Sequence, residues 1–169
     1  KDVEYLIEVF EDAKEYGSIL EVKPVDFDKI EERLEEIEEE QAKMYERGHR
    51  NIILEKLPPL IKQGKIMSRK YDVVCTNPPY MGNRGINGKL KKYLDENYKD
   101  SKSDLFAVFM EVPYVKKNVF LGIINQHSWM FLSSFEKLRK KVIENKTIYS
   151  MIHLGARAFE EIGGEVVQS

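Results

Sequence analysis

The stretch from Tyr71 to Tyr80 constrains the fold more than any other part of this 169-residue sequence. Its first six residues, YDVVCT, are mostly β-branched or apolar, which predicts a buried strand inside a parallel sheet. The strand has to stop at the following NPPY, because two consecutive prolines fix two backbone φ angles and remove two N–H donors. Asn77 precedes a proline and is pushed into an extended conformation. The sequence therefore predicts a strand that ends on a rigid, acceptor-rich segment.

The residues after this segment alternate between amphipathic and apolar runs. The amphipathic runs predict helices at residues 89–98, 104–115 and 135–145, and the apolar runs predict strands at residues 118–128 and 147–154. Residues 81–88, MGNRGING, predict a mobile loop, and Ser101 or Ser103 is expected to cap the helix that follows. This order is typical of an α/β domain with a largely parallel sheet.

Ligands of such sheets bind where the strands end. Three segments fall at predicted strand ends: Asn77–Tyr80, Gln126–Trp129 and Gly155–Arg157. We therefore expect these segments to converge on one face of the sheet.

Residues 1–66 read as an acidic helical region placed ahead of the second domain, residues 67–169. Residues 1–50 hold 17 Asp and Glu against 8 Lys and Arg, whereas residues 51–169 hold 12 against 19. Helices are predicted at 2–16, 26–47 and 51–63. For the second, Asp28 is expected to cap the start and Gly48 to end the helix. The third is expected to break at Pro58 and Pro59.

The composition excludes several classes of protein. A net charge of −2 and a pI near 6.0 give no overall basic signature, so a nucleic acid would need a local basic patch. The single cysteine, Cys75, excludes an internal disulfide and fits a reducing cytoplasm. The three histidines have no metal-ligand spacing, no apolar run is long enough for a membrane span, and no signal peptide is recognisable. We expect a cytoplasmic, metal-independent protein, and both chain ends predict a piece of a longer polypeptide.

The NPPY segment has the chemistry to hold a planar amine. The Asn77 amide oxygen and the Pro78 carbonyl are two fixed acceptors, which can receive both hydrogens of an exocyclic NH2 group. The Tyr80 ring offers a flat surface for stacking, worth about 1–3 kcal/mol per base. Catalysis would then rest on orientation rather than on a strong base. The alternative is that NPPY is only a stiff turn.

NPPY resembles the (Asn/Asp/Ser)-Pro-Pro-(Tyr/Phe/Trp) motif of S-adenosylmethionine-dependent amino-group methyltransferases. Three further segments extend the resemblance: SKSDLFAVFME, NQHSWMFLSSFEKLRKK and HLGARAFEEIGGEVVQS. Over about residues 71–169 the chain is similar to the adenine-specific DNA methyltransferases of BREX phage-defence systems (PglX type). It is similar, more loosely, to restriction–modification methyltransferases with gamma-type motif order.

The resemblance implies a partial Rossmann-like methyltransferase sheet with an N-terminal helical insertion. It implies methyl transfer from S-adenosylmethionine to N6 of an adenine flipped out of the duplex. DNA would be engaged through the full-length protein, with other defence-system subunits as further partners. The family's Gly-rich cofactor loop has no counterpart in this sequence, so the fragment alone is expected to be inactive.

The resemblance also implies roles for individual residues. The implied catalytic residues are Asn77, Pro78, Pro79 and Tyr80. The implied cofactor-binding residues are Asn77, Ser103, Asp104, Leu105 and Phe106. The implied substrate-binding residues are Tyr80, Gln126, His127 and Arg157.

Two other functions stay open at this point. Protein glutamine-amide methyltransferases also use NPPY, because a glutamine side chain and adenine share a planar NH2 group. The chain could instead be a non-catalytic interaction module, in which the acidic helices dock a partner.

Overall fold

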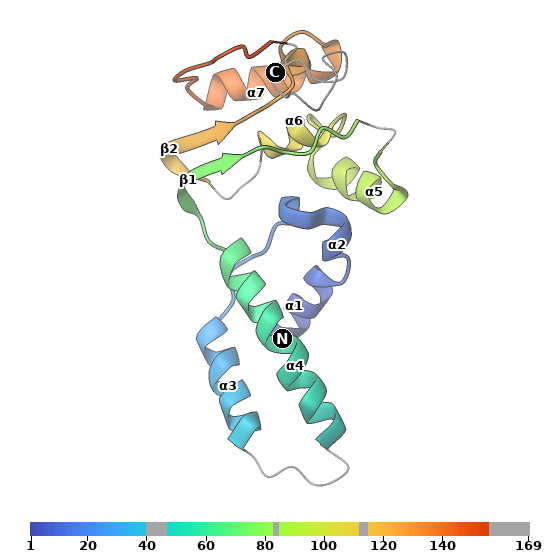
Figure 1. The fold of residues 1–169 in the computed structure, drawn as a ribbon, viewed down its shortest axis with the longest axis vertical. Coiled ribbons are helices and arrows are strands. Elements are labelled where there is room, and N and C mark those ends of the chain that lie inside the picture. Colours follow the sequence, from blue (N-terminus) through green and yellow to red (C-terminus); the bar gives the residue numbers. More distant parts are fainter. Residues whose placement is uncertain (40–46, 83–84, 112–114, 156–169) are drawn as a thin grey trace. The chain divides into compact units, whose positions relative to one another are not determined.

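The computed structural model describes residues 1–39, 47–82, 85–111 and 115–155, with the Asn118 side chain left aside. The chain divides into two compact units, Lys1–Lys70 and Tyr71–Ser169. The first is helical throughout its described elements, and the second contains the sheet (Figure 1).

The first unit contains α1 (Asp2–Phe10), α2 (Ala13–Tyr16), a 3-10 turn at Gly17–Ile19, α3 (Phe27–Glu39) and α4 (Arg47–Met67). Its buried apolar residues come from α1, α3, α4 and the segment between α2 and α3: Leu6, Phe10, Ile19, Leu20, Val22, Ile30, Leu34 and Ile61. α4 packs against both α1 and α3. Because these helices bury apolar faces against one another, the unit has a core of its own.

Several details of the predicted helices are wrong. Asp26, not Asp28, caps α3, since its Oδ1 accepts from the Lys29 N–H at 3.1 Å. Gly48 lies inside α4 rather than ending the preceding helix, although residues 40–46 lie outside the described chain. α4 also continues through Pro58 and Pro59. Packing of α4 on two neighbouring helices outweighs the loss of the proline N–H groups.

The second unit contains β1 (Tyr71–Thr76), α5 (Gly88–Asn97), α6 (Leu105–Phe109), β2 (Val115–Ile123) and α7 (Glu136–Asn145). Two 3-10 turns, His127–Met130 and Ser133–Phe135, join β2 to α7. β1 and β2 are parallel neighbours, with Val73 opposite Phe120 and Thr76 opposite Ile123 (Figure 1). The predicted parallel α/β arrangement is confirmed for these two strands.

The core of this unit lies between α6, α7 and the turns after β2. It consists of Phe106, Ala107, Met110, Trp129, Phe135, Leu138 and Val142, and Tyr80, Ile123 and Met130 pack against it. Leu138 and Val142 are one helical turn apart on α7, as the amphipathic pattern of residues 135–145 predicted.

The strand predictions need two corrections. β1 is not buried within this chain, because Val73 is 59% exposed and the described sheet has two strands. Residues 147–154 form no strand. The Tyr149 ring lies 6.0 Å from the Phe120 ring of β2, but residues 147–154 form no ladder and their side chains are exposed. Joining the edge of a sheet stabilises apolar side chains mainly when it buries them against a neighbouring surface, and these side chains remain exposed.

α6 is shorter than predicted. It ends at Phe109 instead of reaching Val115, which begins β2. Pro113 in the sequence is unsuited to a helix interior. The cap is also different, because the Asp104 side chain takes the role predicted for Ser101 or Ser103.

Candidate active site at the ends of the two strands

The NPPY segment directly follows β1. Pro78 is buried, whereas Asn77 and Pro79 are exposed and Tyr80 is half-buried. Pro78 therefore anchors the segment in the unit while Asn77 faces solvent. This is the arrangement that a side chain needs if it is to meet a ligand.

The Tyr80 hydroxyl joins the ends of the two strands. It lies 3.2 Å from the Asn77 Oδ1 and 3.3 Å from the Ile124 carbonyl oxygen, and it can donate to either. The Ile124 N–H in turn donates to the Thr76 carbonyl at 3.1 Å, which extends the sheet pairing beyond β2. No sequence pattern marks the Ile124 carbonyl, because it is a backbone group 44 residues from Tyr80.

The loop after NPPY is held by the start of α6. The Met81 N–H donates to the Asp104 Oδ1 at 3.0 Å, and the Leu105 N–H donates to the Met81 carbonyl at 3.3 Å. Gly82 and Asp104 form an isolated antiparallel bridge. The mobile loop predicted for residues 81–88 is thus pinned at its first two residues, and residues 83–84 lie outside the described chain.

The Asp104 carboxyl is in an unusual environment for an acid. Desolvation by burial raises its pKa above the usual value, although N–H groups of Phe106, Met81 and Leu105 oppose the rise. The Phe106 N–H lies 3.4 Å from the same oxygen that accepts from Met81.

The other residues implied for cofactor binding differ in accessibility. Ser103 is half-buried, Leu105 is 7% exposed and Phe106 is fully buried. The Phe106 ring packs edge-on against the Tyr80 ring at 6.3 Å and against Phe135 at 5.6 Å. The buried Phe106 ring therefore helps to hold the Tyr80 ring in place.

The segment after β2 lies beside NPPY through the Ile124 contact. Gln126 accepts from the Ser128 hydroxyl at 3.4 Å, and the His127 ring lies 5.6 Å from that of His153. Of the three segments expected to converge, Asn77–Tyr80 thus contacts the residue two positions before Gln126–Trp129, and Tyr80 packs against the cluster that contains Trp129. Arg157 lies outside the described residues, so its role stays a prediction, as do those of the other site residues.

Two residues outside the predicted set of site residues also shape this region. The Asn125 Oδ1 is buried and has no hydrogen-bond partner among the described residues. The Arg139 guanidinium donates to the Trp129 and Leu132 carbonyls at 2.8 and 2.6 Å, which fixes the turn after β2. Asn125 could be found from the sequence because it is a polar residue near the end of a predicted strand. No local sequence pattern marks Arg139.

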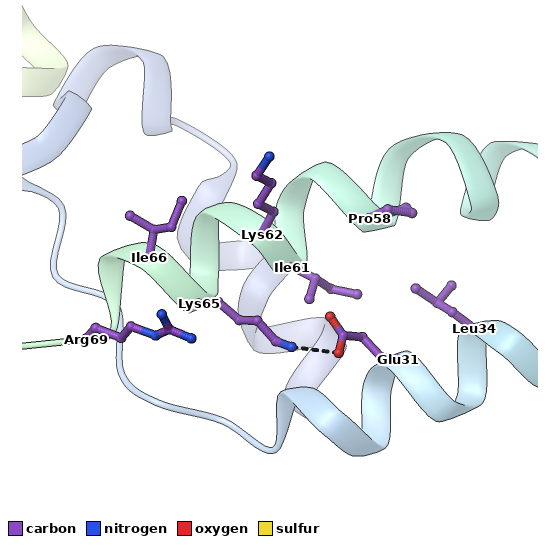
Figure 2. A pocket seen from close by; sticks show the side chains of 8 residues that line it. All are labelled: Glu31, Leu34, Pro58, Ile61, Lys62, Lys65, Ile66 and Arg69. Atoms are coloured by element: carbon purple, nitrogen blue, oxygen red, sulfur yellow. Dashed lines mark hydrogen bonds and ion pairs between the residues drawn. The ribbon is translucent and has the colours of Figure 1, made fainter.

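A groove of about 380 Å³ lies elsewhere, between α3 and α4 of the first unit (Figure 2). Its lining residues are Glu31, Leu34, Pro58, Ile61, Lys62, Lys65, Ile66 and Arg69. Lys65 Nζ and Glu31 Oε2 pair across it at 2.6 Å. The groove contains none of the residues implied for methyl transfer, and its ion pair serves to join two helices.

In the described part of the chain, no helix is long and apolar enough to cross a membrane. Among the same residues, no group of three or more His, Cys, Asp or Glu side chains is arranged to hold a metal ion.

A parallel β-α-β unit with NPPY at the end of its first strand points to a methyltransferase, and comparison with known proteins agrees. The model of the Eco57I restriction-modification methylase family matches residues 7–159, and the chain belongs to that family. The resemblance to adenine-specific methyltransferases is thereby confirmed.

Individual relatives are similar over parts of their length. Adenine-specific methyltransferase BrxX of Escherichia coli O9:H4 (strain HS) is 43% identical over 168 residues, which is 95% of this chain and 13% of the relative. Adenine-specific methyltransferase PglX of Lacticaseibacillus casei (strain Zhang) is 52% identical over 112 residues, 65% of this chain and 9% of the relative.

The type II restriction enzyme and methyltransferase RM.Eco57I of Escherichia coli is 31% identical over 94 residues, 52% of this chain and 9% of the relative. The chain thus spans about an eighth or less of the length of these relatives.

Proposed function

We propose that this chain forms the amine-binding side of the active site in an adenine-N6 DNA methyltransferase. The observation that carries the proposal is the exposed Asn77 at the end of β1, whose amide oxygen lies beside the Tyr80 hydroxyl at 3.2 Å. The printed names of two relatives, adenine-specific methyltransferases, support adenine as the substrate.

The residues present fit the amine that accepts the methyl group. The Asn77 Oδ1 and the Pro78 carbonyl would accept the two N6 hydrogens and orient the nitrogen lone pair. The Tyr80 ring, supported by Phe106, would stack on the flipped adenine. When bound, S-adenosylmethionine would supply an electrophilic methyl group on its sulfur. The N6 lone pair would take this methyl group while the carbon–sulfur bond electrons stay on sulfur as a neutral thioether, and N6 would then lose a proton to water.

The rest of the catalytic domain is part of the proposal. We expect β1 and β2 to belong to a larger Rossmann-like sheet, with residues 1–66 as a helical insertion. Gln126, His127 and Arg157 would line the substrate side, and DNA and other defence-system subunits would be partners of the full-length protein. The 169 residues alone would be inactive and bind S-adenosylmethionine weakly, and micromolar binding by calorimetry would contradict this.

Asn77→Ala in the full-length protein tests the proposal. Loss of one fixed acceptor is expected to lower the rate of adenine methylation at least about 100-fold, with the fold retained by circular dichroism. Asn97→Ala, an exposed asparagine on α5, is the matched control and should keep the parental rate.

The same experiment separates the alternatives. If the full-length protein methylates a protein glutamine in place of duplex DNA, this would favour a glutamine-amide methyltransferase. Methylation that is unchanged in Asn77→Ala would favour the non-catalytic module.

A further inference from the structure

The NPPY segment has few means of fixing its own backbone. Pro78 and Pro79 have no N–H groups, so these positions cannot donate to a neighbouring strand or loop. The first N–H groups after the prolines belong to Tyr80 and Met81. Of these, the Met81 N–H donates to the Asp104 carboxylate at 3.0 Å. An acid 23 residues further along the chain therefore holds the backbone immediately after the acceptors.

Asp104 and the residue after it engage both backbone groups of Met81. The side chain of Asp104 accepts the Met81 N–H, and the Leu105 N–H donates to the Met81 carbonyl at 3.3 Å. The Gly82–Asp104 bridge adds a neighbouring backbone pairing. A Cβ on Gly82 would lie 3.5 Å from the Asp104 Oδ2, which is ordinary van der Waals contact.

The same carboxylate begins α6. Its Oδ1 accepts from the Phe106 N–H at 3.4 Å, as an N-cap side chain does. The Phe106 ring, fully buried, then packs against Tyr80 at 6.3 Å. Three successive residues, Asp104 to Phe106, thus fix the Met81 N–H, the Met81 carbonyl and the Tyr80 ring.

We propose that Asp104 is a positioning residue, which holds the Asn77–Tyr80 segment in the geometry for methyl transfer by tying Met81 to the start of α6. The inference rests on the proposed function. The geometry requires that residue 104 place an acceptor oxygen within hydrogen-bond distance of the Met81 N–H. It does not require a negative charge. An amide oxygen of the same length meets that requirement.

Two substitutions of Asp104 in the full-length methyltransferase distinguish the effect of side-chain length from the effect of negative charge. Asp104→Asn keeps the acceptor at the same distance and loses the charge, and its kcat should stay within about threefold of the parent. Asp104→Glu keeps the charge but lengthens the side chain, and its kcat should fall about 10- to 100-fold because the acceptors are displaced. In both variants the KM for S-adenosylmethionine and for duplex DNA should stay within about twofold.

The opposite order would overturn the inference. If Asp104 binds the cofactor through its charge, Asp104→Glu will be more active than Asp104→Asn, and the KM for S-adenosylmethionine will rise in Asp104→Asn. Equal and parental activity of both variants would also overturn it. Asp95→Asn, which removes a surface carboxylate paired with Lys102 on the same unit, is the control and should leave all constants unchanged.

The outcome can be told apart from failure of the proposed function. If Asn77→Ala is inactive while Asp104→Glu is fully active, the proposed function stands and only the role of Asp104 is wrong. If Asn77→Ala keeps full activity, the proposed function itself is wrong. Thermal melting of each variant establishes that the protein is folded. Asp104→Asn and Asp104→Glu both keep an oxygen at the N-cap of α6, so the test does not need an alanine substitution that would remove the cap.

Discussion

At the scale of single residues, two aspartates of the second unit differ in the sign of their pKa shift. Burial raises the pKa of the Asp104 carboxyl above its usual value, against opposing hydrogen bonds from Phe106, Met81 and Leu105. The hydrogen bond from Lys102 lowers the pKa of the exposed Asp95 carboxyl. The two acids should therefore respond to pH in opposite directions.

A pH series of denaturation experiments tests this difference. A raised pKa in the folded state means that Asp104 favours folding most below its unfolded-state pKa of about 4, and that this contribution is lost as the pH rises. Asp104→Asn should therefore gain stability relative to the parent between about pH 3.5 and pH 7. Asp95→Asn should lose stability relative to the parent over the same rise, because a lowered pKa contributes above the unfolded-state value. The same sign for both variants in urea denaturation would contradict the assignment.

At the scale of elements, α4 shows that packing can outweigh local preference. The helix runs through two prolines and contains two glycines, Gly48 and Gly64. Gly64 is buried, and a Cβ there would lie 2.9 Å from Phe27 and 3.2 Å from Leu6. The absent side chain is thus what lets α4 approach α1 and the start of α3.

The two glycines form a matched pair for mutation. Gly64→Ala should destabilise the protein by about 1–3 kcal/mol, because overpacking against Phe27 and Leu6 exceeds the helix-propensity gain. Gly48→Ala should stabilise it by about 0.5–1 kcal/mol, since no atom of the described residues lies within 4 Å of the added Cβ. Chemical denaturation measures both changes. If Gly64→Ala raises the free energy of unfolding, the Phe27 and Leu6 side chains must move aside without destabilising the protein, which would contradict the prediction.

At the scale of the whole molecule, each unit has its own core. Leu6 is fully buried in the first unit and Leu138 in the second, and the chain divides at Lys70. A unit with its own core can open without the other.

Hydrogen exchange of two core variants tests whether the units unfold separately. Leu6→Ala should lower the protection of amides in residues 1–70 by an amount equivalent to about 2–5 kcal/mol, and Leu138→Ala should do so in the second unit. Each variant serves as the control for the other. If either substitution lowers protection in both units equally, the chain unfolds as one cooperative structure.

The sequence by itself determined the features that depend on neighbouring residues. Continuous apolar, β-branched runs predicted β1 and β2, helical periodicity predicted α5 and α7, and the prolines predicted the rigid end of β1. These rest on φ restrictions and side-chain spacing, which are local. The same local chemistry marked Asn77 as an acceptor.

Only the tertiary structure decided which groups meet. The Tyr80 hydroxyl reaches a carbonyl 44 residues away, and the Asp104 carboxylate that caps α6 also accepts from Met81, 23 residues earlier in the chain. α4 continues through its prolines because it packs against α1 and α3, whereas residues 147–154, whose side chains stay exposed, form no strand. Such contacts join segments far apart in the sequence, so no local pattern records them.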